Sequence, residues 1–140
     1  MFLDALKLYS ARVVSRTAQT LSEASTPVAG IQAVFDDLTA GIGTDSGKLG
    51  CFMVNSVAEL VPYDREVTKI AAAYSTSMER LFSEALTRAG AEGTVTGKQT
   101  PAELATYVFN AMQGIRILIK SGATRAQVEA VVAQTITSLR

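Results

Sequence analysis

Apolar residues in the segment 101–122 cover more than one side of the helix that the segment can form. They are Tyr107, Val108, Phe109, Ala111, Met112, Ile115, Ile117, Leu118 and Ile119. The polar stripe between them is narrow, since only Thr106, Asn110, Gln113 and Lys120 follow one another at helical spacing. A helix on the surface of a small domain normally carries one apolar stripe roughly 100° wide, and this helix carries about twice that width. The pattern predicts a helix with two covered faces and leaves open what covers the second.

The rest of the chain also has helical periodicity, and no stretch alternates strictly enough to predict a strand. Helices are predicted at residues 2–24, 27–41, 49–61, 65–90, 101–122 and 125–139. The helix at 65–90 has the most regular apolar stripe, so we expect it to form the centre of the domain. The segment 41–50 contains four glycines and is expected to be the most mobile. The sequence therefore predicts an all-α fold of six helices.

Residues that cap helix N-termini precede most of these segments. They are Thr26, Asp64, Thr100 and Thr124, and proline takes the first helical position after Thr26 and Thr100. The helix at 2–24 lacks such a residue before Phe2. We therefore expect the chain to be the continuation of a longer protein.

Composition indicates one folded domain spanning residues 1–140. Apolar residues make up 48% of the chain and charged residues 19%, and no apolar run reaches the 18 or so residues of a membrane span. The 13 basic and 13 acidic residues balance. Because a nucleic-acid surface needs clustered positive charge, we expect no DNA contact by this chain alone.

The chain contains no histidine and one cysteine, Cys51. Ser-His-Asp and Cys-His nucleophilic sites and histidine-ligated metals are therefore excluded. Cys51 cannot form an internal disulfide and is interpreted as a buried structural thiol. We expect a cytoplasmic protein that is not an enzyme and that needs neither metal nor cofactor.

A second copy of the chain is the simplest cover for the second face of the helix at 101–122. Gly114 and a shallow alanine-lined face on the helix at 125–139 would allow helices to approach closely. Two helices from each subunit would then form an intermolecular four-helix bundle about a two-fold axis. A central helix buried within one monomer is the alternative. The interface residues predicted are Met112, Gly114, Ile115, Leu118, Val128, Val131, Val132, Thr135 and Ile136.

Two stretches of the chain resemble the C-terminal regulatory domain of TetR-type transcriptional repressors. One contains Gly50, Cys51, Asn55 and Glu59 in "GCFMVNSVAELV", and the other contains the Gln113-Gly114-Ile115 turn. "MFLDALKLY" resembles the start of the first helix that follows the DNA-binding head in such proteins. The family's N-terminal helix-turn-helix head is not present in this chain, which therefore could not read an operator. The resemblance implies a homodimeric sensor whose small-molecule effector binds among the first four helices and releases DNA in the full-length protein.

We expect the effector cavity to be apolar and aromatic, which suits a small apolar or aromatic ligand. Its predicted lining residues are Tyr9, Val13, Phe35, Leu38, Met53, Val54, Val57, Tyr74, Met78 and Leu81. Ordinary core packing would explain each of them as well. Arg12 and Arg16 could meet an anionic effector, although a solvated helix face explains them more simply.

Two other functions are consistent with the residues. A purely structural helical dimerisation module would have the same periodicity with a filled interior. A small helical enzyme would use carboxylates such as Glu59 or Glu84 together with a tyrosine. The enzyme is the weaker of these two alternatives, because residues of catalytic types do not cluster along the chain.

Overall fold

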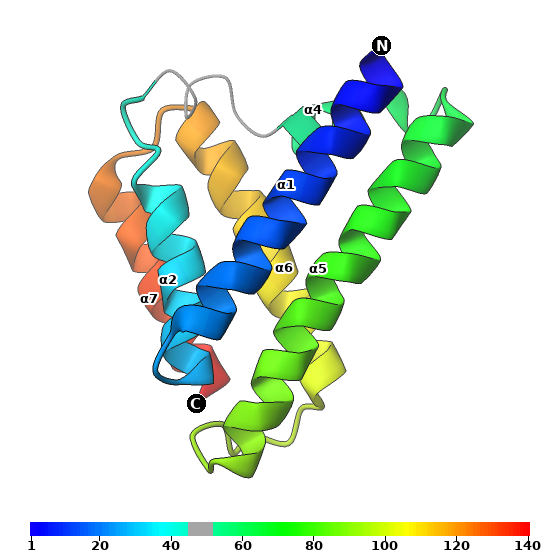
Figure 1. Ribbon diagram of the computed structural model, residues 1–140. Coiled ribbons are helices and arrows are strands. Elements are labelled where there is room, and N and C mark those ends of the chain that lie inside the picture. The colour runs from blue at the N-terminus through cyan, green and yellow to red at the C-terminus, as the bar shows by residue number, and fades with distance from the viewer. Residues whose placement is uncertain (45–51) are drawn as a thin grey trace.

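The computed structural model describes residues 1–44 and 52–140, and its secondary structure there is helical throughout (Figure 1). The helices are α1 (Phe2–Glu23), α2 (Pro27–Thr39), α4 (Phe52–Leu60), α5 (Arg65–Ala91), α6 (Pro101–Lys120) and α7 (Arg125–Leu139). The all-α, six-helix prediction is thus confirmed for this part of the chain. The expectations for Cys51 and for most of the glycine-rich segment fall on residues 45–51, outside the described residues.

The predicted caps hold the N-termini of four helices. Asp64 accepts hydrogen bonds from the backbone N–H groups of Glu66 and Val67, at 2.9 and 3.2 Å. Thr26 accepts from the backbone N–H of Ala29, at 3.1 Å. Thr100 and Thr124 each form a reciprocal capping box, with Glu103 and Gln127 respectively. These contacts satisfy N–H groups that the first helical turn leaves without partners.

Two helices end two residues before their predicted C-termini. α2 ends at Thr39 instead of residue 41, because the chain tightens and Gly41 N–H bonds to Leu38 O at 3.0 Å. α6 ends at Lys120, and Gly122 follows with φ +91°, in the left-handed region that favours glycine. This glycine reverses the chain so that α7 can pack back on the bundle.

α5 is the central helix of the domain, as its stripe predicts. It packs against α1, α2, α4 and α6, and its contact with α6 is the most extensive. The buried residues of its stripe are Val67, Ile70, Tyr74, Met78, Phe82, Ala85, Leu86 and Ala89. Figure 1 shows α1 alongside α5, with α2 and α7 at the opposite side of α1. The core therefore lies between α5 and the other helices.

The turn between α1 and α2 brings two backbones together at Gly30. A Cβ at this position would lie 3.2 Å from Leu21 Cδ2 and 3.3 Å from both Ala24 Cβ and Leu21 Cα. Glycine therefore allows the two helices to approach closely, although the sequence pattern alone did not single it out.

None of the described helices is both long and apolar enough to cross a membrane.

Candidate functional site

One face of α6 makes side-chain contacts with three other helices. It carries Thr106, Phe109, Gln113, Arg116 and Lys120, which follow one another at steps of three and four residues and so share one side. We call this set the inner stripe of α6. Its two ends, Thr106 and Lys120, are exposed, whereas Phe109, Gln113 and Arg116 between them are partly buried.

The contacts of the inner stripe run from one end of α6 to the other. Thr106 Oγ1 donates to Glu79 Oε2 on α5 at 3.2 Å. The ring of Phe109 packs edge-on to that of Tyr74, also on α5, with centroids 5.9 Å apart. α6 is therefore joined to α5 through its N-terminal half.

The second half of the inner stripe reaches α1 and α4. Arg116 Nη1 donates to the hydroxyl of Tyr9 on α1 at 3.1 Å. Lys120 Nζ donates to Asn55 Oδ1 on α4 at 2.8 Å. Since α1, α4 and α5 all contact the same face of α6, a change in the spacing of these helices must alter this stripe.

The middle of the inner stripe lies inside the protein. Gln113 Oε1, Arg116 Nε and Tyr74 Oη are all buried from solvent. Gln113 Oε1 accepts no hydrogen bond from any described residue. A buried amide oxygen without a donor costs free energy.

Aromatic rings lead from this region toward the surface. Tyr9 packs against Phe52 with ring centroids 5.7 Å apart, and Phe52 packs against Phe2 at 5.6 Å. Phe2 and Phe52 are both partly exposed, whereas Tyr9 is largely covered. The site thus combines aromatic surface with a few polar atoms, a combination typical of small-molecule sites.

The predicted effector residues differ in how deeply they are buried in the structure. Phe35, Met53, Tyr74 and Met78 are buried in the core, and Tyr9, Val13, Leu38, Val54 and Leu81 are partly buried against it. Tyr9 and Tyr74 both meet the inner stripe of α6, through Arg116 and Phe109. Val57 is 38% exposed, because the buried side of α4 carries Met53 and Ser56 and Val57 lies on its outer side. Val57 is therefore not placed with the others.

Sequence reasoning did not identify Phe109, Gln113, Arg116 or Asn55 as site residues. For the three residues on α6, the signal was the recurrence of polar residues at helical spacing in line with Phe109, which is partly buried. Arg12 and Arg16 lie on the exposed face of α1, and Arg16 Nε lies 3.6 Å from Asp37 Oδ2 at the surface. The solvated interpretation of this pair therefore matches their position.

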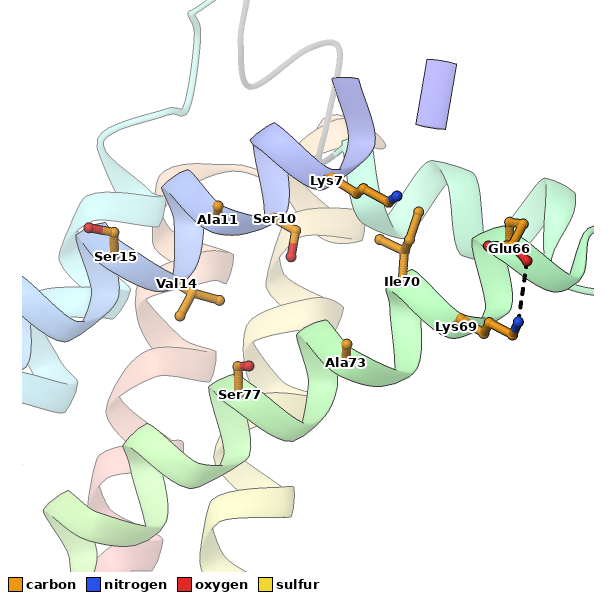
Figure 2. Close-up of a pocket in the computed structure, with 10 residues that line it drawn as sticks. All are labelled: Lys7, Ser10, Ala11, Val14, Ser15, Glu66, Lys69, Ile70, Ala73 and Ser77. Atoms are coloured by element: carbon orange, nitrogen blue, oxygen red, sulfur yellow. Dashed lines mark hydrogen bonds and ion pairs between the residues drawn. The ribbon is translucent and has the colours of Figure 1, made fainter. Parts of the chain in front are cut away.

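A surface groove of about 550 Å³ lies between α1 and α5 (Figure 2). Its lining residues are Lys7, Ser10, Ala11, Val14, Ser15, Glu66, Lys69, Ile70, Ala73 and Ser77. Half of them are serine or alanine, and these short side chains leave a groove between the two helices. Lys69 is directed toward Glu66, 3.3 Å away, at one end. None of the predicted effector residues lines this groove.

A second groove of about 430 Å³ lies on the other side of α6, next to α7. Its lining residues are Tyr107, Asn110, Ala111, Gly114, Ile115, Leu118, Val131 and Thr135. Nearby apolar side chains are exposed to solvent: Tyr107 by 42%, Ile117 by 53% and Leu118 by 36%. The described part of a single chain therefore leaves apolar surface on α6 exposed. This agrees with the sequence, in which apolar residues occupy more than one side of this helix.

The predicted interface residues divide into two groups. Met112, Ile115, Val128, Val132, Thr135 and Ile136 are buried in the core of the single chain. They are buried because α7 turns its valine and isoleucine side toward α2 and α6 of the same chain. Gly114, Leu118 and Val131 retain access from outside. A Cβ on Gly114 would meet no atom within 4 Å, so its close-packing partner is not found among the described residues of its own chain.

Comparison with known proteins places this fold among transcription regulators. Residues 27–134 match the family of transcriptional regulator LmrA/YxaF-like C-terminal domains. The chain belongs to this family, which is a TetR-type regulator family and not a family of enzymes. The alternative of a small helical enzyme is therefore rejected. A search of curated proteins gives no match.

Solved structures share the fold over nearly the whole chain. The reduced form of Escherichia coli NemR superposes with a TM-score of 0.83 at 17% identity, covering 99% of this chain and 71% of NemR. A cysteine mutant of the TetR family regulator CifR, complexed with 26-bp operator DNA, superposes with a TM-score of 0.82 at 23% identity. That match covers 98% of this chain and 72% of CifR. At these identities the likeness shows the fold alone.

Proposed function

We propose that this chain is the effector-sensing and dimerising domain of a TetR-type transcriptional repressor. The observation that carries the proposal is the inner stripe of α6, where buried polar atoms and aromatic rings from α1, α4 and α5 converge. Family membership supports a regulatory domain. A small apolar or aromatic molecule is the effector that such surroundings suit.

The contacts of the inner stripe suggest how binding is transmitted. Arg116 connects α6 to α1, and Lys120 connects α6 to α4. An effector that binds better to one spacing of these helices would shift the protein toward that spacing. In the full-length regulator, we propose that α1 carries this shift to an N-terminal helix-turn-helix domain and releases operator DNA.

We propose that the outer faces of α6 and α7 form the homodimer contact. Tyr107, Ile117, Leu118 and Val131 supply apolar surface there, and Gly114 leaves room for a neighbouring helix. A glycine inside a helix costs about 1 kcal/mol relative to alanine, which close packing against a partner would offset. Two copies related by a two-fold axis would place four helices together.

Sedimentation velocity on the 140-residue chain tests the dimer. We expect a dimer at micromolar concentration and no mobility shift of DNA by this chain. A monomer that persists at 100-fold higher concentration would contradict the proposal.

A ligand panel tests the sensor against the alternative of a purely structural dimerisation module. The close burial of Phe35, Met53 and Met78 favours that alternative, since a filled interior leaves a ligand no room. A ligand that binds only the folded chain raises its melting temperature. We expect planar aromatic compounds to raise it and polar sugars of similar size to have no effect. Failure of every aromatic compound would favour the structural module.

A further inference from the structure

Asn110 places a polar amide on the outer face of α6. It follows Tyr107 by three residues and precedes Gly114 by four, so the three share one side of the helix. All three line the groove of about 430 Å³ beside α7. Asn110 is exposed in the single chain, so water can hydrogen-bond its amide there. A protein that covers this groove must replace that water, because a buried amide without partners costs free energy.

The charges that line the two surface grooves differ. Lys7, Glu66 and Lys69 line the groove between α1 and α5, whereas the described lining of the groove beside α7 contains no charged residue. Charged residues are depleted at the centres of protein interfaces. Two identical uncharged surfaces can also meet without repulsion between like charges. The groove beside α7 therefore suits contact with a second copy of the chain.

The same face of α6 combines a hollow with protruding apolar side chains. Gly114 lines the hollow, and Ile117, about one turn further along, is 53% exposed. In an isologous contact, each copy can place its protruding side chains against the hollow of the other. The shape of this face is therefore compatible with a copy of itself.

The amide of Asn110 is also complementary to a second amide. It contains both N–H donors and a carbonyl acceptor, so two such groups can each donate to the other. Asn110 is the tenth residue of the 20-residue helix α6, close to its middle. A two-fold axis that passes near the middle of α6 would bring this residue next to its own copy.

Building on the proposed dimer, we infer that the Asn110 amides of two copies hydrogen-bond to each other across the two-fold axis and determine the choice of partner. A single asparagine in an otherwise apolar helix contact specifies register and oligomeric state at some cost in stability. A related chain with an apolar residue at this position would leave the Asn110 amide buried without a partner. Such a chain would be rejected in favour of a second copy.

Paired charge variants test whether residue 110 meets its own copy. The homodimers of Asn110→Asp and of Asn110→Lys would each bring two like charges together. We therefore expect their dissociation constants in sedimentation equilibrium to rise about tenfold or more above wild type. A mixture of the two variants should form a one-to-one heterodimer about tenfold or more tighter than either homodimer, since the charges are then opposite. Native mass spectrometry identifies the heterodimer by its mass.

Two sets of controls separate pairing at residue 110 from a general effect of charge. Thr76→Asp and Thr76→Lys, at an exposed position inside α5, should form homodimers like wild type and show no preference for the mixture. Asn110→Leu should dimerise at least as tightly as wild type, because it replaces a polar pair with an apolar one. It should exchange poorly with wild-type subunits. Since Asn110 is exposed in the single chain, all its variants should retain the helical circular dichroism of wild type.

Each failure of this experiment has a distinct meaning. A wild-type chain that stays monomeric would contradict the proposed dimer and this inference together. Charge variants that dimerise as tightly as wild type would leave the proposed dimer standing and overturn the pairing of Asn110. Weaker homodimers without a preference for the mixture would place Asn110 in the contact but away from its copy, which also overturns the inference.

Discussion

Arg116 on α6 donates a hydrogen bond to the hydroxyl of Tyr9 on α1 at 3.1 Å, although the two residues are 107 positions apart in the sequence. The bond is partly buried and joins the helix that we propose for dimerisation to the first helix of the chain. Because a guanidinium is its donor, it should be stronger than a hydrogen bond between neutral groups. We therefore expect this hydrogen bond to stabilise the domain and to take part in the proposed transmission of effector binding between α6 and α1.

Tyr9→Phe should destabilise the domain by removing the acceptor of this hydrogen bond. Hydrogen bonds to charged groups are worth about 1.5 to 3 kcal/mol, so we expect a loss in that range. The free energy of unfolding in urea measures it. Tyr63→Phe is the matched control, since Tyr63 is 87% exposed. Equal stabilities for both variants would show that the Arg116–Tyr9 bond contributes nothing.

Gly114→Leu should weaken the proposed dimer without destabilising the single chain. A Cβ here would meet no atom of residues 1–44 or 52–140 within 4 Å, and leucine is a better helix former than glycine by nearly 1 kcal/mol. Sedimentation equilibrium should therefore show a larger dissociation constant, while unfolding at low protein concentration shows equal or greater stability. Gly114→Ala is the smaller control. An unchanged dissociation constant for Gly114→Leu would place the contact elsewhere.

Thr100→Ala should destabilise the start of α6 by about 1 kcal/mol, the usual cost of losing an N-cap. Thr100 accepts from the backbone N–H of Glu103 at 3.2 Å, and Glu103 Oε2 accepts from the backbone N–H of Thr100 at 2.7 Å. Thermal unfolding measures the change. Thr76→Ala, at an exposed position inside α5, should change stability by less than about 0.5 kcal/mol. A Thr100 variant as stable as the control would contradict the capping role.

Gly30→Val should destabilise the contact between α1 and α2. The added side chain would begin 3.3 Å from the backbone at Leu21, which cannot move aside as a flexible side chain can. Overpacking of this kind costs about 1 to 3 kcal/mol, measurable by chemical denaturation. Gly30→Ala should cost less, because it adds a single methyl group and favours the helix. Wild-type stability in Gly30→Val would mean that the helices separate without cost.

The family could be inferred from residue order, but the site could be inferred only in part. Tyr9 and Tyr74 were predicted as effector residues, and the structure brings both to α6. Gln113 and Arg116 were missed because a polar residue at helical spacing usually indicates a solvated face. Deciding between water and protein requires knowing which helices pack there.

The sequence by itself determined the helices of the described chain, because caps, prolines and three-four spacing act within a few residues of one another. It also indicated that α6 has more apolar surface than one covered face requires. Only the tertiary structure decided that Val128, Val132 and Ile136 fill the chain's own core while Leu118 and Val131 remain accessible. The reason is physical: periodicity defines which residues share a face, whereas the partner of each face depends on contacts between segments far apart in the chain.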